Sequence, residues 1–189
     1  MRNFLFAALL AGTATPALAA ESYVLDPSHS QIVFSYDHLG YSTTWGMFSG
    51  FEGQIEFDRE NPAASSVTVE FPVSTMLTGW EARLAHFMSP DFFDPSRDQT
   101  VRFVSTAIEV TGEDTALITG DLTLNGVTQP VVLDVRLNHA GTHPMEGKEW
   151  AGFSASTTLT RSEFDLGLFA PFVGDEVAVL ISVEAMKAD

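Results

Sequence analysis

Residues 116–137 read ALITGDLTLNGVTQPVVLDVRL, two apolar-rich runs joined by Asn125-Gly126. Val, Ile, Leu and Thr dominate both runs, and apolar residues alternate with polar ones, which is the pattern of half-buried strands. Asn-Gly is the strongest short-range signal for a two-residue hairpin turn, because both residues tolerate a positive φ. The stretch therefore predicts two antiparallel strands, residues 116–124 and 127–137.

The same alternation recurs along most of the chain. Gly46, Gly50 and Gly53 interrupt the run at 45–57, as glycines do where a strand bends and a sheet curves. About eight strands at regular spacing are typical of an antiparallel barrel or sandwich, and eight make a barrel just wide enough for one small ligand. The other predicted strands are residues 32–38, 67–73, 101–110, 150–160 and 177–183.

One stretch has helical rather than strand periodicity. Trp80, Leu84 and Phe87 fall at positions i, i+4 and i+7 and so share one face of a helix, which Pro90 ends. The sequence therefore predicts one short helix near residues 79–89, held to the sheet by these three side chains.

Residues 1–19 have the composition of a signal peptide. A positively charged start precedes the short apolar segment 4–10, and Ala17 and Ala19 supply the small residues that a signal peptidase requires. The segment is too short to span a membrane, so we expect cleavage, a periplasmic or secreted protein, and no stable membrane insertion. Residues 20–189 then form one domain, long enough to bury a core.

Acidic residues dominate the charge of the chain. It has 25 Asp and Glu against 9 Lys and Arg, a formal net charge of −16 at pH 7. Such a surface repels nucleic acid and anionic lipid head groups, so neither is an expected partner. The chain has no cysteine, which excludes disulfides, thiol chemistry and cysteine-based metal sites.

The sequence contains no recognisable catalytic motif. Asp26, Ser28 and His29 are so close in sequence that in an extended chain their side chains cannot form the hydrogen-bonded Ser–His–Asp arrangement of a catalytic triad. A turn closed by the Asp and Ser side chains fits them better. The acidic pair Asp91 and Asp94 has no distinguishing spacing in so acidic a chain. We therefore predict no catalytic residue and class the protein as a non-enzyme.

The five histidines do not have the spacing of a metal site. None lies at i and i+4 of a helix, so we expect no metal and no cofactor. His139 and His143 share one loop, where a transient metal site is the alternative to a solvated loop. His38 ends an apolar strand face, and two interpretations of it stay open: a core histidine, or a polar group at a cavity mouth.

Aromatic residues are unusually frequent, with 15 phenylalanines. They exceed what a small barrel needs merely to close. Filling the core is the commoner role of such side chains, and lining a cavity for a large apolar ligand is the alternative. Composition alone favours the core.

Motifs spread over residues 23–185 resemble the YceI-like family, in the family's order, although each motif is weak singly. Two positions depart from the family pattern: Leu84 stands where an acidic residue usually follows the helix arginine, and Asp165 where a glycine usually ends the last motif. The matching segments are YVLDPSHS (23–30) with Phe34 and His38, GMFSGFEGQIEF (46–57), Arg83, His86 and SPDFFD (89–94), GDLTLNGVT (120–128), Gly152-Phe153, RSEF (161–164) and PFVGDEV (171–177).

The resemblance implies a lipocalin-like antiparallel barrel that holds a polyisoprenoid or similar long-chain amphiphile inside, for transport, storage or stress response. A pyrophosphate head would need a cation, for which Arg83, His86, Arg161 and Arg102 are the candidates. A neutral head such as a quinone would not, and it suits the acidic chain better. The expected ligand-binding residues are Phe34, Tyr36, His38, Trp45, Phe48, Phe51, Trp80, Leu84, Phe87, Phe92, Phe93, Phe103, Phe153, Phe164 and Phe169.

The favoured function is a periplasmic or secreted lipid-binding carrier. Two alternatives stay open: an enzyme acting on such a lipid through His38 or His86, and a stress or interaction protein with a packed core and no ligand. A homodimer also stays open. For the carrier we expect the helix to close one end of the barrel as a lid, with Trp80 and Phe87 over the lipid. Phe34 and Phe153 are expected to belong to the stabilising core.

Overall fold

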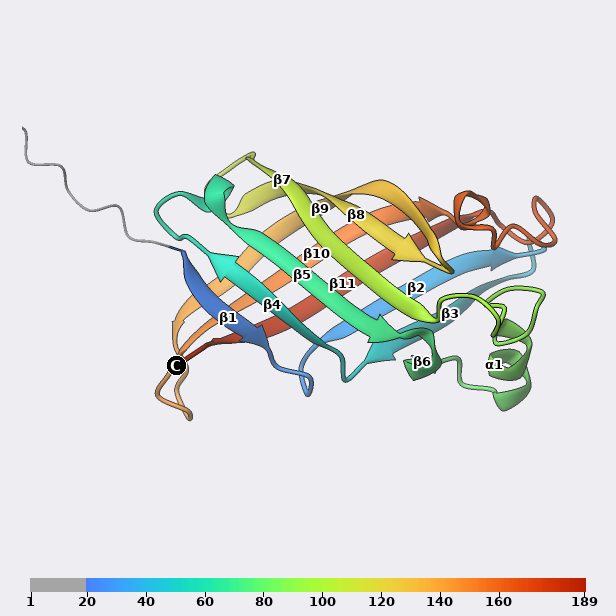
Figure 1. Ribbon diagram of the computed structural model, residues 1–189, viewed down its shortest axis with the longest axis horizontal. Helices are drawn as coiled ribbons and strands as arrows, with labels where there is room; N and C mark the ends of the chain where they lie inside the picture. Colours follow the sequence, from blue (N-terminus) through green and yellow to red (C-terminus); the bar gives the residue numbers. More distant parts are fainter. Residues whose placement is uncertain (1–19) are drawn as a thin grey trace, which may run out of the picture.

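Eight long antiparallel strands close into a barrel in the computed structural model, which describes residues 20–189 (Figure 1). This confirms the predicted all-β barrel. Three of the eight strands are each broken into two shorter ones. The elements, with η for a 3₁₀ helix, are β1 (Glu21–Leu25), β2 (Gln31–His38), β3 (Ser42–Ser49), β4 (Glu52–Phe57), η1 (Pro62–Ala64), β5 (Ser66–Pro72), η2 (Val73–Thr75), β6 (Met76–Leu77), α1 (Glu81–Phe87), β7 (Thr100–Val110), β8 (Thr115–Leu124), β9 (Val127–Thr142), β10 (Glu149–Thr160), η3 (Arg161–Phe164) and β11 (Glu176–Lys187).

The barrel closes where the first strand meets the last. Tyr23 in β1 lies opposite Lys187 in β11 on one side and Ile55 in β4 on the other. The first half of β11 pairs with β2 and its last residues pair with β1. Strands β1 and β2 therefore act as one strand with a bend between them. Around the ring they are followed by β3 with β4, β5 with β6, and then β7 to β10.

The bends between the broken strands lie side by side in the sheet. The first bend is the one between β1 and β2. The second, between β3 and β4, is at Gly50, whose φ of 73° is readily adopted only by glycine. The third is η2, between β5 and β6. Gly46, also expected to mark a bend, lies instead inside β3, where it makes room for a neighbouring ring.

The β8–β9 hairpin forms as predicted. Asn125 and Gly126 have φ values of 53° and 75°, and positive φ at both central positions is what a type I′ turn requires. The Asn125 side chain is fully buried, and its Nδ2 donates a 3.1 Å hydrogen bond to the carbonyl of Phe164. The turn therefore also fixes η3 against this end of the barrel.

The helix is shorter than residues 79–89, because its first turn starts only at Glu81. Thr78 Oγ1 donates a 2.9 Å hydrogen bond to the Trp80 carbonyl, and Trp80 itself has extended backbone angles. Its indole is 64% exposed. The expectation that Trp80 anchors the helix is therefore wrong, and Leu84 and Phe87, with the C-cap residue Met88, pack against the core instead.

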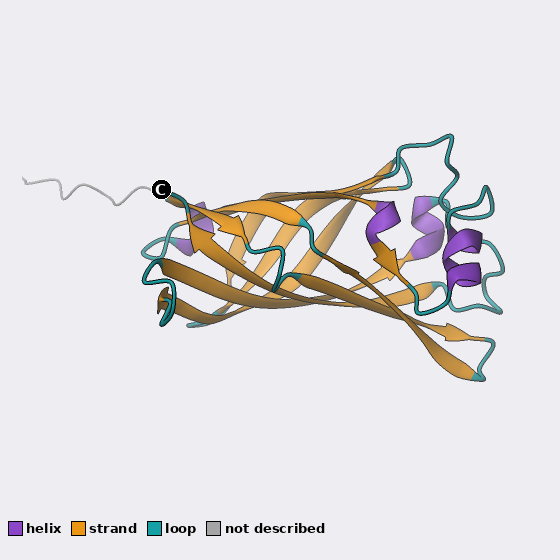
Figure 2. Cartoon of the chain, turned by 90° about the horizontal axis from the view of Figure 1, so that it is seen from below, coloured by secondary structure: helices purple, strands orange, loops and turns teal. Residues whose placement is uncertain are grey.

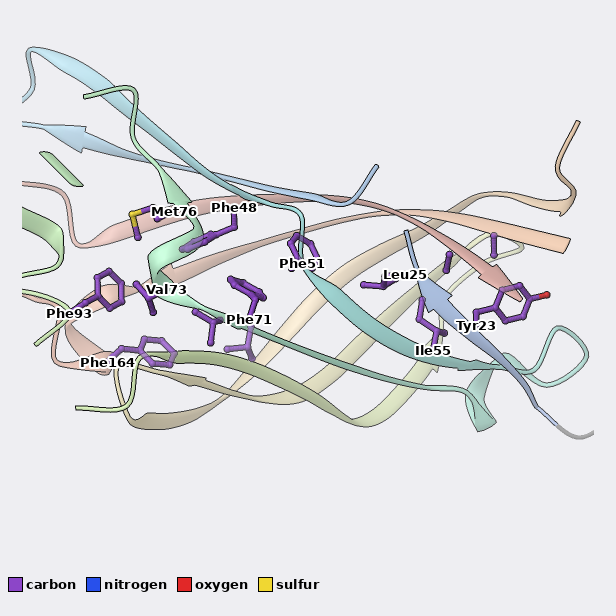
Figure 3. Packing of buried hydrophobic residues seen from close by; sticks show 14 of the residues in the cluster. Tyr23, Leu25, Phe48, Phe51, Ile55, Phe71, Val73, Met76, Phe93 and Phe164 are labelled. Carbon is purple, nitrogen blue, oxygen red and sulfur yellow. The ribbon is translucent and has the colours of Figure 1, made fainter. Parts of the chain in front are cut away.

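The two ends of the barrel differ in structure (Figure 2). One end, called here the helix end, carries α1, η2, η3 and the β2–β3 turn. The other, the hairpin end, carries η1 and the β7–β8 and β9–β10 turns, with both ends of the described chain nearby. Buried side chains extend along the axis between them, from Met76 and Phe93 to Tyr23 (Figure 3).

Candidate functional site

The barrel encloses a cavity of about 530 Å³ with an almost entirely apolar wall. Its wall residues include Phe87 and Phe92 at the helix end and Val110 and Pro62 at the hairpin end, so the cavity runs the length of the barrel. A volume of this size is typical of sites that hold a drug-sized or larger apolar ligand. The interior is therefore only partly filled by the protein's own side chains.

Aromatic side chains form one part of this wall. Phe71 lies at its centre, with ring centroids 5.0 Å from Phe48 and 5.1 Å from Phe51. Phe57 and Phe71 also line the cavity, although they were not among the ligand-binding residues predicted from the sequence; both continue the alternation of their strands. Of the expected ligand-binding residues, those on the cavity wall are Phe34, Tyr36, Phe48, Phe51, Phe87, Phe92, Phe93, Phe103, Phe153 and Phe164.

Aliphatic side chains of β8–β11 form the opposite part of the wall, and the sequence interpretation did not single them out as ligand residues. They point inward yet are only half-buried, because they face the open cavity rather than a packed neighbour. Period-two alternation was the signal that could have found them. They include Ile118, Leu122, Leu133, Leu137, Leu159, Val177, Ile181 and Val183.

Two glycines let aromatic rings lie flat against the wall. A Cβ atom on Gly46 would lie 2.2 Å from Cζ of Phe34, its cross-strand partner. A Cβ on Gly120 would lie 2.4 Å from Cζ of Phe103 on the adjacent strand β7. Covering a glycine in this way is a common means of pinning strands in curved sheets. Here it also keeps both rings close to the wall.

Five expected ligand-binding residues are not on the cavity wall. Trp45 lies on the outer face of β3, because it is three residues from the inward-facing Phe48 and alternation places the two on opposite faces. His38 is exposed at the end of β2, so of its two interpretations the core histidine is wrong. Leu84 packs on the core from outside the cavity. Trp80 and Phe169 are also outside and more than half exposed.

Three of the four cationic candidates are paired outside the cavity. Arg83 donates a 3.0 Å hydrogen bond to the Thr78 carbonyl and lies over the Trp80 ring. His86 Nε2 lies 3.0 Å from an oxygen of Asp91. Arg102 is on the outer surface, with its Nε 3.4 Å from Glu70. None of the three lines the cavity.

Arg161 does line the cavity, beside Tyr36, but its guanidinium already holds the chain that follows it. It donates hydrogen bonds to the carbonyls of Leu166, Leu168, Val173 and Gly174. Desolvation by burial lowers the pKa of this guanidinium, although the charges of Asp175 and Tyr36 oppose the shift. Arg161 thus keeps the 165–175 loop in place, and few of its donors remain for a ligand.

The hairpin end of the wall contains polar groups that the sequence interpretation missed. Arg59, Glu113 and Asp114 line the cavity here together with Ser65. Arg59 Nη1 lies 3.9 Å from Glu149, and its Nη2 donates to the carbonyl of Ala140. Among residues 20–189, Arg59 and Arg161 are the only cations on the wall, and they lie at opposite ends. No local sequence pattern marks Arg59.

Asp26, Ser28 and His29 form a closed turn rather than a catalytic triad. The backbone N–H and Oγ of Ser28 donate to Asp26. His29 Nδ1 lies 2.5 Å from Asp26 and 3.0 Å from the Ser28 hydroxyl, so serine and aspartate share one ring nitrogen. A triad needs them on opposite nitrogens. This geometry agrees with the predicted turn.

The same turn shifts two pKa values. The hydrogen bond to Asp26, aided by the charge of Glu184, raises the pKa of His29. Burial raises the pKa of Asp26, but hydrogen bonds from His29 and Ser28 outweigh it and leave that pKa below its ordinary value. The nitrogen and oxygen atoms of Asp26, His29 and Glu184 that could bind a metal ion lie within 4.8 Å of one another. His143, one of the two histidines considered for a transient metal site, instead has its ring centroid 4.7 Å from the ring of Trp150.

No helix within the described part of the chain is both long enough and apolar enough to cross a bilayer.

Comparison with known proteins places these features in a family. The family model described as YceI-like domain matches residues 23–185. A UPF0312 protein of Ectopseudomonas mendocina (strain ymp) is 39% identical over 186 residues, covering 96% of each chain.

Two solved structures have the same fold. Burkholderia cenocepacia BcnA matches with a TM-score of 0.76 and 24% identity, over 85% of this chain and 98% of that one. A polyisoprenoid binding domain from Saccharophagus degradans, implicated in plant cell wall breakdown, matches with a TM-score of 0.64 and 14% identity, over 89% and 99%. At these identities the likeness concerns the fold alone. The family model and the relative at 39% identity show that the chain belongs to the YceI-like domain family.

Proposed function

We propose that this protein is a carrier that holds one long-chain isoprenoid or similar amphiphilic lipid in its barrel and performs no chemistry on it. The observation that carries the proposal is the apolar cavity of about 530 Å³ running between the two ends of the barrel. The polyisoprenoid binding domain with the same fold supports the choice of ligand class.

Burial of the lipid tail supplies the affinity. Removing roughly 600 Å² of apolar tail surface from water contributes about 15 kcal/mol before costs, at about 25 cal/mol per Å². Lost rigid-body freedom and tail flexibility offset much of this, which leaves micromolar or tighter binding. Polar contacts are then needed only to select the head group.

The charges on the wall favour a neutral head group, such as a quinone or an alcohol. A diphosphate needs several converging cations. The two on the wall, Arg59 and Arg161, lie at opposite ends, and each already has protein partners. Tyr36, close enough to Arg161 for their charges to interact, adds a phenol on the wall that can donate one hydrogen bond to a carbonyl or hydroxyl head.

Nothing on the described wall suggests turnover of the lipid. His38 and His86, the candidates for an enzyme, both lie off the cavity wall. The carrier is therefore proposed without a catalytic step. Its export depends on the signal peptide predicted for residues 1–19, which lie outside the described residues, and a mature chain beginning at Ala20 is the expected form.

Native mass spectrometry of protein purified from its own host tests the proposal. We expect a copurifying lipid, and we expect Ala155→Phe to lower its occupancy at least about tenfold, since each 1.4 kcal/mol of lost affinity is tenfold. Ala155 lines the cavity, whereas Thr158 on the same strand faces out, so Thr158→Phe is the matched control. Wild-type protein that never carries lipid, or equal occupancy in the two variants, would contradict the proposal.

A further inference from the structure

Exposed aromatic side chains gather at the helix end of the barrel. Among residues 20–189, every aromatic side chain that is largely exposed is on the β2–β3 hairpin, next to α1, or in the loop between η3 and β11. Figures 1 and 2 show these three segments around the same end. We call this group the aromatic rim: Tyr41, Trp45, Trp80, Phe169 and Phe172, with Tyr41 90% and Phe172 75% exposed.

The aromatic rim is continuous with the cavity. The Phe169 ring lies 6.4 Å from Phe92, and Phe92 lies 5.5 Å from Phe87. Phe92 and Phe87 both line the cavity. A chain of aromatic rings therefore leads from Phe169 on the rim to the cavity wall, beside the ring of His86.

The hairpin end has no such surface. Its exposed large apolar side chains in the described chain are Val24, Val110 and Met145, and none of them is aromatic. Apolar groups gathered on one exposed surface commonly mark a site of interaction. The asymmetry therefore singles out the helix end as the interacting end.

We propose that the aromatic rim docks peripherally on the surface of a zwitterionic or uncharged lipid bilayer, so that lipid passes between bilayer and cavity without entering bulk water. The proposal rests on the carrier function proposed above. Trp and Tyr are the side chains best suited to a bilayer interface, because each has a large apolar body and a polar tip.

Charge identifies the kind of bilayer. The chain has a net charge of −16, and Asp37 in β2 and Asp175 in the loop between η3 and β11 lie on segments that carry the rim. An anionic surface is therefore repelled, whereas a zwitterionic one accepts the rim. Three separate loop tips around a cavity mouth also suit shallow contact with a fluid surface.

Docking has a kinetic consequence. If the lipid leaves only while the rim touches an acceptor bilayer, the transfer rate rises in proportion to the concentration of acceptor vesicles. If the lipid instead escapes through water, release limits the rate, which then does not depend on acceptor concentration.

The test compares two double variants. Tyr41→Ser with Phe172→Ser removes the two most exposed rim side chains, neither of which lines the cavity. Met145→Ser with Leu180→Ser removes two exposed apolar side chains away from the rim and is the control. Phosphatidylcholine vesicles are used for flotation, and a fluorescent long-chain prenol for transfer between donor and acceptor vesicles.

The rim variant is expected to lose at least about tenfold in vesicle partitioning and in transfer rate, because burial of one large apolar side chain corresponds to a tenfold change or more. The control variant should match the wild type. Vesicles containing phosphatidylglycerol should bind the wild type more weakly at low salt.

Three results overturn the docking proposal: unchanged vesicle binding by the rim variant, transfer independent of acceptor concentration, or a wild-type dimer that the rim mutations dissociate in sedimentation. Prenol binding measured without vesicles separates the two proposals. It should be equal in all three proteins, and its absence from the wild type would refute the carrier function instead.

Discussion

The first and second halves of the barrel are built differently. In the first half each strand is broken: β1 from β2, β3 from β4, and β5 from β6. In the second half β7 to β11 run unbroken for 10 to 16 residues. In this half the rings of Phe48 and Phe51 both pack against the ring of Phe71. The unbroken strands instead present a mainly aliphatic wall to the cavity, with Phe103 and Phe153 as its aromatic members.

This difference means that the two halves contribute differently to stabilising the fold and to providing space for a ligand. Tight packing of apolar side chains stabilises a fold, but it leaves no space for a ligand. Here the large buried rings of the strands lie in the bent half, whereas the unbroken half buries smaller side chains such as Val131 and Ala151 and keeps its larger aliphatic side chains half-buried around the cavity. Substitutions in the two halves should therefore have different consequences for stability and for lipid binding.

The largest expected effect is on stability in the bent half. Phe71→Ala should lower the free energy of unfolding by about 3–5 kcal/mol, because it removes a buried ring packed between two others. Leu133→Ala, on the wall of the unbroken half, should cost about 2 kcal/mol or less, since its side chain already borders a void. Urea denaturation of lipid-free protein measures both. Equal losses would show that the two halves are not distinct.

A smaller effect is expected at the two glycines beneath aromatic rings. Gly120→Ala should cost about 2–3 kcal/mol, because its new methyl would meet the carbonyl oxygen of Val104 as well as the Phe103 ring. Gly46→Ala should cost about 1 kcal/mol, since its new methyl meets the Phe34 ring, which can swing into the cavity. Thermal unfolding compares their stabilities. A larger loss for Gly46→Ala would refute this reasoning.

A third comparison concerns the helix at the mouth. Phe87→Ala should raise the lipid off-rate roughly tenfold, equivalent to about 1.4 kcal/mol, because Phe87 lines the cavity at the helix end. Trp80→Ala should leave release into lipid-free solution unchanged and alter stability by less than about 0.5 kcal/mol, because Trp80 is exposed. Stopped-flow release and denaturant midpoints test this on the same two variants. If the two variants release lipid at the same rate, α1 does not act as a lid.

The smallest effect is the pH dependence of the first bend. The raised pKa of His29 stabilises the fold fully below its unfolded value near 6.5, and this stabilisation is lost as pH rises through the folded-state pKa. The lowered pKa of Asp26 stabilises above its unfolded value near 3.8, and this is lost as pH falls through the folded-state pKa. The stability difference between wild type and His29→Gln should therefore be largest between these values and shrink above pH 6.5. A pH-independent difference in denaturant midpoint would contradict the pairing.

Much of the fold follows from local sequence. Alternation located the unbroken strands to within a few residues, and Asn125-Gly126 located their tightest hairpin. Both are properties of neighbouring residues, and side-chain direction in a strand is fixed by position alone. The same rule places Trp45 on the face opposite the inward-facing Phe48 and so excludes it from the cavity wall.

The cavity could not be predicted in this way. Whether Phe34 and Phe153 fill a core or border a void depends on the curvature of the closed barrel, and both line the cavity rather than being fully buried. The partners of Arg161 are carbonyl groups that only the folded loop brings together. The sequence by itself determined which segments are strands and which side chains are apolar. The tertiary structure decided which of those side chains meet each other and which face open space, because ring closure depends on contacts between residues far apart in the chain.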